Sequence, residues 1–283
     1  MVSEDALSVD IRRSVAAALA EDIGTGDISA ELIDRHGVAS ATVTTRQDGV
    51  FCGLAWADEV LTQVDPAIRS HWHVADGDHI HAEQCLVDLT GPSRGLLTAE
   101  RSLLNFLQLL SGTATLTARY VEAIAEYPAT ILDTRKTIPG MRLAQKYAVR
   151  CGGARNHRLG LYDAFLIKEN HIAAIGSIGA AITQARVTAS GRPLRVVVEV
   201  EVETEEQLLE ALAAEPDIIM LDNFDVAALS RAVEQTAGRA KLEASGGITL
   251  SNLAAIAATG VDYVSVGEIT KQIIPLDLSM RFA

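Results

Sequence analysis

The sequence predicts an α/β protein with a C-terminal α/β barrel, TIM-like and either closed or incomplete, and an N-terminal α+β sandwich domain. Two observations carry this prediction. From about residue 130 onward, short apolar runs rich in β-branched residues alternate with helical patterns. This alternation is typical of parallel βαβ units whose sheet is covered on both faces. The first 110 residues differ, because short β segments with Asp-Gly turns replace the alternation there.

Each expected element of the C-terminal part follows from this alternation. Near-continuous apolar runs are the strand candidates, and the stretches between them carry helical periodicity. Six such units in series favour a barrel over an open sheet. Strands are expected at 130–134, 163–168, 195–202, 217–223, 241–245 and 261–267, and helices near 141–151, 177–189, 204–214, 225–237 and 249–259.

The N-terminal part predicts paired strands within 39–54 with a turn at Asp48-Gly49, then a helix near 55–64. A second β segment at 73–91 turns at 76–78, and a strongly apolar helix covers 98–112. We therefore expect two domains, 1–112 and 113–283, with the extreme termini able to pack across the boundary.

Composition excludes several classes of protein. The chain of 283 residues has a formal net charge of −13, and this acidic balance disfavours a nucleic-acid binder. The first twenty residues lack the basic start and the apolar run of a signal peptide, so a cytoplasmic location is expected. Three widely spaced cysteines argue against a disulfide framework and a cysteine zinc site. Four clustered histidines indicate a polar strand face more readily than a metal site: His71, His73, His79 and His81.

Polar residues stand where the expected strands end. The carboxyl ends of barrel strands converge on one face, which carries the active site in barrel enzymes. Helix N-capping could explain Asp222, Asn223 or Ser245 singly, but not Arg, Lys and Glu at several ends together. The strand ends carry residues 133–136, Lys168 to His171, Glu199 with Glu201, Asp222-Asn223, Ser245-Gly246-Gly247 and Gly267-Glu268.

The segment 133–171 concentrates positive charge, with eight of the 24 Lys and Arg residues against three acids. Its helix presents Arg142, Lys146 and Arg150 at i, i+4 and i+8, a face that alone indicates exposure to solvent. Arg155 follows the helix, and the other four cations flank separate strands: Arg135, Lys136, Arg158 and Lys168. Cations collected from separate elements repel one another, so this set predicts a ligand with more than one negative group. A dicarboxylate, a phosphorylated small molecule, or both would fit.

The opposite side of the expected barrel mouth is acidic. Glu199 and Glu201 alternate onto one side of their strand, and Asp222 ends the next strand. These carboxylates could hold Mg²⁺, could bond ribose hydroxyls, or could form structural ion pairs with the basic side.

Small residues end the last two strands, in "EASGGI" and "SVGE". Backbone N–H groups there could approach a phosphate at a helix N-terminus. The pocket would then suit the joining of a carboxylated ring to a phosphorylated ribose. Arg101 stands in the first turn of the expected helix 98–112, where it either seeks an anionic partner or lies over Leu104.

Seven motifs together resemble the quinolinate phosphoribosyltransferase family, over about residues 21–270. The block "DTRKTIPGMRLAQKYAVRCGGARNHRLGLYDAFLIKENH" is the most specific. The other motifs are "EDIGTGDIS", "TAERSLLNFLQLLSGTAT", "VEVEVET", "IMLDNF", "EASGGI" and "GVDYVSVGEIT".

The resemblance implies a two-domain enzyme of de novo NAD synthesis, which converts quinolinate and phosphoribosyl pyrophosphate into nicotinate mononucleotide, pyrophosphate and CO₂. It implies a homodimer in which the N-terminal domain of one subunit covers the barrel mouth of the other. It also implies Mg²⁺ as the cofactor.

The resemblance also assigns roles to residues. It implies that residues of one subunit bind quinolinate together with Arg101 of the other subunit. It also implies that Glu201, rather than Glu199, is the acidic ligand. It implies catalytic roles for Lys136, Glu201 and Asp222, of which the two acids would be the metal ligands. The own-subunit residues for quinolinate are Arg135, His157, Arg158 and Lys168, and the substrate-binding set also includes Thr134, Ser245, Gly246, Gly247 and Gly267.

Three rival interpretations were open. A related phosphoribosyltransferase could act on another carboxylated ring, but the intact set of clustered cations favours quinolinate. A non-catalytic anion-binding barrel would be expected to lack an acidic or phosphate-site residue, and every matched position is filled. A nucleic-acid binder would need aromatic residues interleaved with the basic ones, and aromatic residues make up 4% of the chain.

Overall fold

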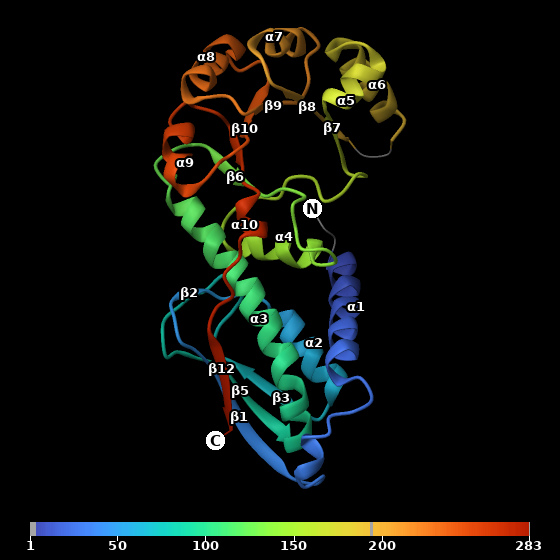
Figure 1. Cartoon of the computed structure of the whole chain (residues 1–283), viewed down its shortest axis with the longest axis vertical. Coiled ribbons are helices and arrows are strands. Elements are labelled where there is room, and N and C mark those ends of the chain that lie inside the picture. The colour runs from blue at the N-terminus through green and yellow to red at the C-terminus, as the bar shows by residue number, and fades with distance from the viewer. Residues whose placement is uncertain (1–3, 193–194, 283) are drawn as a thin grey trace. The chain divides into compact units, whose positions relative to one another are not determined.

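The computed structural model describes residues 4–192 and 195–282. The chain divides into two compact units, each drawn from separate stretches of sequence (Figure 1). Unit 1 comprises Met1–Ala118, Thr137–Gly153 and Ile269–Ala283, and unit 2 comprises Arg119–Lys136 and Ala154–Glu268.

Unit 2 contains a parallel six-stranded sheet, as the sequence predicts. The strands run in the order β6-β11-β10-β9-β8-β7. At the seam between the two end strands the described residues form one isolated bridge, Leu132 with Arg155, rather than a strand pairing. The barrel is therefore incomplete. Its strands are β6 (Thr130–Leu132), β7 (Ala164–Ile167), β8 (Val197–Val202), β9 (Ile218–Asp222), β10 (Lys241–Ser245) and β11 (Tyr263–Ser265).

Helices surround the outer side of these strands (Figure 1). Several begin at a residue whose side chain accepts a backbone N–H, namely Ser177, Thr204 and Asp225, which is the usual way a helix starts. One short helix, α5, was not predicted, because its seven residues open with a polar run rather than an amphipathic pattern. The outer helices are α5 (Glu169–Ile175), α6 (Ile178–Ser190), α7 (Glu205–Ala213), α8 (Val226–Thr236) and α9 (Leu250–Ala257).

Unit 1 is built on an antiparallel sheet in the order β12-β1-β5-β3. Along β1 the buried and less buried residues alternate, as expected for a strand with one face on a core. The C-terminal strand β12 pairs with β1, so the last residues of the chain complete the first sheet. The strands are β1 (Val38–Thr45), β3 (Arg69–Trp72), β5 (Cys85–Pro92) and β12 (Leu278–Phe282), with a separate pair β2 (Gly49–Val50) and β4 (His79–Ile80).

The helices of unit 1 bury their apolar faces in one core with this sheet, around Trp56, Leu86 and Leu107. No single helix among the described residues is long and apolar enough to cross a membrane, although the bent pair α5 and α6 passes that test by length and composition together. The remaining helices are α1 (Glu4–Ile23), η1 (Ala30–Leu32), α2 (Leu54–Val64), α3 (Ser93–Glu122), α4 (Arg142–Cys151) and α10 (Glu268–Lys271).

The expected helix 98–112 is wrong in both bounds, because α3 spans Ser93–Glu122. Gly112, where the predicted helix stops, lies inside α3. A Cβ built at Gly112 would stand 2.4 Å from the carbonyl oxygen of Ile274, so this glycine permits close packing of the C-terminal segment instead of ending the helix. Arg101 consequently lies beyond the first turn of α3, and the argument from the helix dipole does not apply to it.

Candidate active site

A cavity of about 390 Å³ opens at the carboxyl ends of the unit 2 strands. It brings together nine of the predicted site residues from six separate parts of the chain. Glu243 and Ser265 also line it, and neither was predicted. The lining residues are Thr134, Arg135, Lys136, His157, Arg158, Leu166, Lys168, Glu201, Met220, Asp222, Glu243, Ser245 and Ser265.

Asp133 fastens the two basic loops of the cavity to each other. It follows β6 and is fully buried. Its Oδ1 accepts the backbone N–H of His157 at 2.9 Å, and its Oδ2 accepts the side-chain amide of Asn156 at 2.6 Å. The loop after β6, which carries Arg135 and Lys136, is thereby held against the loop that carries His157 and Arg158.

The cationic side of the cavity is crowded. Burial, and next the neighbouring Arg135, lower the pKa of Arg158, against an opposing effect of Glu199. Asp163 holds the chain just after Arg158 by accepting the backbone N–H groups of Leu159 at 2.7 Å and Gly160 at 3.0 Å. The predicted convergence of cations from separate elements is therefore present in the fold.

Glu201 and Asp222 form the acidic side. Glu201 stands beside Met220 across the β8–β9 pairing, and Asp222 ends β9 two residues later. Glu201 forms a direct ion pair with Lys168, which also lines the cavity. Asp222 accepts a hydrogen bond from the side chain of Asn223 at 2.8 Å. Two carboxylates that line one cavity leave oxygen ligands available for a cation that also binds phosphate.

Glu199 is placed differently from Glu201. Its side chain is 2% exposed and lies behind the cavity wall, where its Oε2 is 2.9 Å from Nε2 of His157. Glu243 on β10 has a fully buried side chain, with Oε2 3.7 Å from the same nitrogen. Burial, and next the charge of Glu199, raise the pKa of Glu243 to about 8. The sequence did contain a signal for Glu243, namely a charged residue inside the short apolar run "KLEAS".

Glycines shape the loop after β10. Gly246 has φ +94°, and a Cβ built there would lie 2.2 Å from Oδ1 of Asn223, so a side chain is excluded by both strain and contact. Gly247 has φ +59°. A Cβ at Gly267 would stand 3.0 Å from Cδ of Lys136. Each glycine keeps backbone close to a cavity residue or in a conformation that L side chains rarely adopt.

The remaining predicted cations lie in unit 1. Lys146 is fully buried, so the interpretation of its helix face as solvent-exposed is wrong at this position. Arg150 is exposed, and Arg142 Nε donates to the hydroxyl of Thr137 at 2.7 Å. Arg101 is exposed on α3, and its role toward a ligand stays a prediction.

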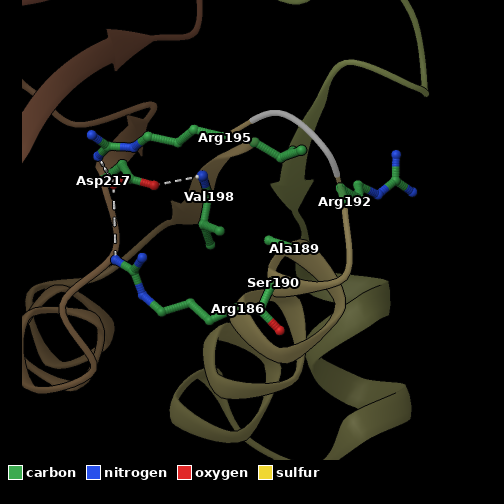
Figure 2. A pocket seen from close by; sticks show the side chains of 8 residues that line it. Arg186, Ala189, Ser190, Arg192, Arg195, Val198 and Asp217 are labelled. Atoms are coloured by element: carbon green, nitrogen blue, oxygen red, sulfur yellow. Dashed lines mark hydrogen bonds and ion pairs between the residues drawn. The ribbon is translucent and has the colours of Figure 1, made fainter.

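A second cavity, of about 320 Å³, lies at the amino end of β8 (Figure 2). Arg186, Arg192 and Arg195 line it, together with Asp217. Asp217 is already engaged, because its carboxylate accepts the guanidinium of Arg195 at 2.9 Å and the backbone N–H of Val198 at 2.8 Å. The one acid among its described lining residues is therefore already paired within the cavity wall, whereas the first cavity is lined by Glu201, Asp222 and Glu243.

The histidine cluster of unit 1 also engages in local contacts. His73 Nε2 is 2.7 Å from Asp88 Oδ2, and the ring of His71 packs edge-on against that of His73. His79 and His81 lie on and just after β4, both exposed. These contacts fit the polar strand face that the sequence predicts.

The fold is an incomplete parallel barrel, and both cations and carboxylates line the cavity at its mouth. These features are typical of an α/β-barrel enzyme that binds an anionic ligand. The family model for the quinolinate phosphoribosyl transferase C-terminal domain matches residues 113–281, and the model for the N-terminal domain of the same family matches residues 27–111. The chain therefore belongs to the quinolinate phosphoribosyltransferase family.

Named relatives agree with this assignment. The chain is 45% identical over 260 residues to the probable nicotinate-nucleotide pyrophosphorylase [carboxylating] of Bacillus subtilis, covering 92% of this chain and 89% of that one. It is 43% identical over 276 residues to the nicotinate-nucleotide pyrophosphorylase [carboxylating] of Mycobacterium leprae, covering 95% and 96%. The solved structure of the Francisella tularensis nicotinate-nucleotide pyrophosphorylase superposes with a TM-score of 0.94 at 48% identity, covering 98% and 97%.

Proposed function

We propose that this protein transfers the phosphoribosyl group of phosphoribosyl pyrophosphate to quinolinate, with decarboxylation, and so forms nicotinate mononucleotide, pyrophosphate and CO₂ for NAD synthesis. One observation carries the proposal. Cations from three separate elements face Glu201 and Asp222 across a single cavity, in a chain of the quinolinate phosphoribosyltransferase family.

The cationic side suits a ring with two adjacent carboxylates. Arg135 and Arg158 offer planar guanidinium groups that pair with carboxylates through two parallel hydrogen bonds, and Lys168 adds a point charge. Bound in this way, the ring would present its nitrogen toward the acidic side, where the ribose is attacked. Orientation of the two reactants is a large part of the rate enhancement expected at such a site.

The acidic side suits Mg²⁺ together with the ribose and its phosphates. The donor set fits, because Mg²⁺ favours one or two carboxylates plus substrate phosphate oxygens, and Glu201 and Asp222 line the cavity beside Lys136. When bound, Mg²⁺ would neutralise charge on the departing pyrophosphate. The loop of Ser245, Gly246 and Gly247 would receive the ribose phosphate on its backbone N–H groups.

The reaction can then be written with these residues. The ring nitrogen attacks the anomeric carbon as the bond to pyrophosphate breaks, and Lys136 stabilises the leaving oxygens. Glu201 and Asp222 stabilise the positive charge that develops on the ribose. The new bond makes the ring nitrogen cationic, so the electron pair of the adjacent C–CO₂⁻ bond flows into the ring as CO₂ leaves. A proton from solvent completes the product, so no general base is required.

The proposal includes a homodimer in which Arg101 of one subunit reaches the cavity of the other. The exposed position of Arg101 on α3 supports this. Co-expression of Arg101→Ala and Glu201→Gln subunits tests it, because a mixed dimer would regain one intact site if Arg101 acts in trans. Recovered activity in the mixture, with neither variant active alone, is the expected result. No recovery in mixed dimers would show that Arg101 serves its own subunit or neither. The cytoplasmic location stays a prediction that cell fractionation would check.

The activity itself is tested by mixing the protein with Mg²⁺, phosphoribosyl pyrophosphate and quinolinate, and following nicotinate mononucleotide by mass spectrometry. Nicotinate serves as a parallel substrate that has one carboxylate instead of two. Product from quinolinate alone is expected. Product from nicotinate instead would show that the cations do not select two carboxylates, and tight anion binding without product would indicate a non-catalytic barrel.

A further inference from the structure

A polar cluster with two buried acids lies at the cationic side of the cavity, and the proposed reaction gives these acids no role. Its members are His157, Glu199 and Glu243, whose nitrogen and oxygen atoms lie within 4.8 Å of one another. The two carboxylic side chains are 2% and 0% exposed. Burial of two acids side by side is costly, so their presence calls for a function or a strong compensation.

The ring of His157 has a defined orientation. Its Nδ1 accepts the backbone N–H of Arg158 at 2.7 Å. A ring nitrogen that accepts a hydrogen bond carries no proton, so the proton of the neutral ring is on Nε2. That nitrogen faces the carboxyl groups of Glu199 and Glu243. His157 therefore connects the buried acids to the backbone of the guanidinium-bearing residue of the cavity.

The charges around Glu243 can be assigned strand by strand. Glu199 faces it from β8, His157 from the loop before β7, and the hydroxyl of Ser265 from β11. Its register partners are Met220 on β9, which carries no charge, and Tyr263 on β11. The nearest polar group to this pair of acids is the imidazole of His157, and a proton on Glu243 reduces the buried negative charge to a single carboxylate.

We propose that Glu243 is a positioning residue for the dicarboxylate substrate: with Glu199 it fixes the ring of His157, which fixes Arg158, and its proton keeps a second negative charge away from the anion site. The inference rests on the proposed function. It adds Glu243 to the residues that support quinolinate binding, and it predicts that this binding weakens at alkaline pH. Glu243 itself acts through His157 and the local field.

A pH limit follows for substrate binding. With a pKa of about 8, Glu243 loses its proton on the alkaline side of neutrality. The cluster then carries two carboxylates beneath a site that must bind a dianion. If the protonated form alone binds quinolinate well, its population falls about tenfold between pH 7 and pH 9, and the apparent affinity falls with it.

The experiment measures binding of quinolinate and, separately, of phosphoribosyl pyrophosphate by calorimetry between pH 6.5 and 9.5. In the unmodified protein quinolinate binding should weaken about tenfold from pH 7 to pH 9. In Glu243→Gln, which keeps the shape and removes the ionisation, the pH dependence of quinolinate binding should disappear. Glu234→Gln on the exposed surface of α8 is the matched control and should bind like the unmodified protein.

Other outcomes would overturn the inference. These are an unmodified protein without the alkaline weakening, a Glu243→Gln variant that keeps it, and a weakening equally large for phosphoribosyl pyrophosphate. Glu199→Gln provides a second variant, which should raise the KM for quinolinate at pH 7 more than it lowers kcat. Because binding is measured apart from turnover, a protein that binds quinolinate with this pH profile but forms no product would contradict the proposed function and leave the positioning role supported.

Discussion

Two polar clusters, a half-buried one in unit 1 and a buried one in unit 2, differ in how their hydrogen-bonding groups are satisfied. In unit 1, Asp76 accepts the backbone N–H groups of Gly53 and Leu54 at 2.8 and 3.1 Å and the hydroxyl of Tyr147 at 2.7 Å. In unit 2, Oε1 of Glu199 accepts no hydrogen bond from the residues that the structure describes, and the carboxyl group of Glu243 has only the Ser265 hydroxyl and the Glu199 carboxylate as polar neighbours besides His157. The first cluster supplies hydrogen bonds to the start of α2 and to Tyr147 of α4. The second cluster buries carboxyl groups with few hydrogen bonds, which costs free energy.

The difference indicates which cluster stabilises the fold and which serves the reaction. A satisfied carboxylate holds local structure together and can be explained without a ligand. Glu199 and Glu243 are incompletely hydrogen-bonded and lie beside a cationic cavity. Such energetically unfavourable arrangements, with shifted pKa values, are concentrated at functional sites. Substitutions in the two units should therefore produce opposite patterns in stability and activity.

The largest expected effect is on ligand binding, in Arg135→Ala. Loss of a charge-paired guanidinium from the cavity should weaken quinolinate binding by roughly 100-fold or more, since breaking such pairs costs about 2–5 kcal/mol. Binding of phosphoribosyl pyrophosphate and the thermal unfolding midpoint should change little. Calorimetry with each substrate checks this, and an equal loss for both substrates would show that Arg135 does not belong to the quinolinate side.

A reversed pattern is expected in unit 1, for Asp76→Ala. Two backbone N–H groups at the start of α2 and the Tyr147 hydroxyl would lose their acceptor, which should lower the free energy of unfolding by ~2–3 kcal/mol. Denaturant unfolding measures the change. The KM for quinolinate at a temperature where the variant is folded should stay near that of the unmodified protein, and a selective rise in that KM would break the contrast between the clusters.

Glu243→Gln should change stability in the opposite direction, and in a pH-dependent manner. Because the pKa is raised in the folded state, from 4.5 to about 8, the folded protein binds more protons than the unfolded chain between these values. Stability therefore falls as the pH rises from about 4.5 to 8, and the glutamine variant escapes this loss. At pH 8 the variant should be more stable than the unmodified protein, with no gain at pH 4. Denaturant unfolding at both pH values decides, and a loss of stability at pH 8 would contradict the prediction.

The smallest effect is expected for Tyr147→Phe. The ring packs against Trp56 with centroids 5.4 Å apart, so the aromatic contact remains and one hydrogen bond to Asp76 is lost. The expected cost is ~1 kcal/mol in the free energy of unfolding. Denaturant titration of this variant beside Asp76→Ala would show whether the two losses overlap, as they should if both residues share one hydrogen bond.

The sequence predicts the repeating part of the fold well, for a physical reason. In unit 2 the strands β8, β9 and β10 are mostly buried, and the longer outer helices bury one face, so local composition carries the pattern. The bounds of α3 and the presence of β12 depend on residues that are distant in sequence. Gly112 lies inside α3 because Ile274 packs against it, and β12 forms because it pairs with β1. Nothing within a few residues of either position encodes that information.

The candidate site follows the same division. Residues at strand ends could be found because parallel strands bring their carboxyl ends together, and the cations and acids predicted there do line one cavity. Glu243 was missed because its importance depends on Glu199 and His157, which are far away in sequence. Lys146 was read as exposed because its spacing matched a polar helix face, whereas the fold buries it completely.

The pairing of β12 with β1 has a consequence for how the protein is made. Synthesis runs from the N-terminus, so β1 and β5 emerge long before residues 278–282 exist. Until then β1 is an edge strand whose N–H and C=O groups lack their final partner, and such edges invite pairing with other chains. The last segment of unit 1, which begins at Ile269, is translated only after all of unit 2. The edge of β1 is therefore covered only once residues 278–282 have been translated, and removal of these residues should lower the solubility of the protein.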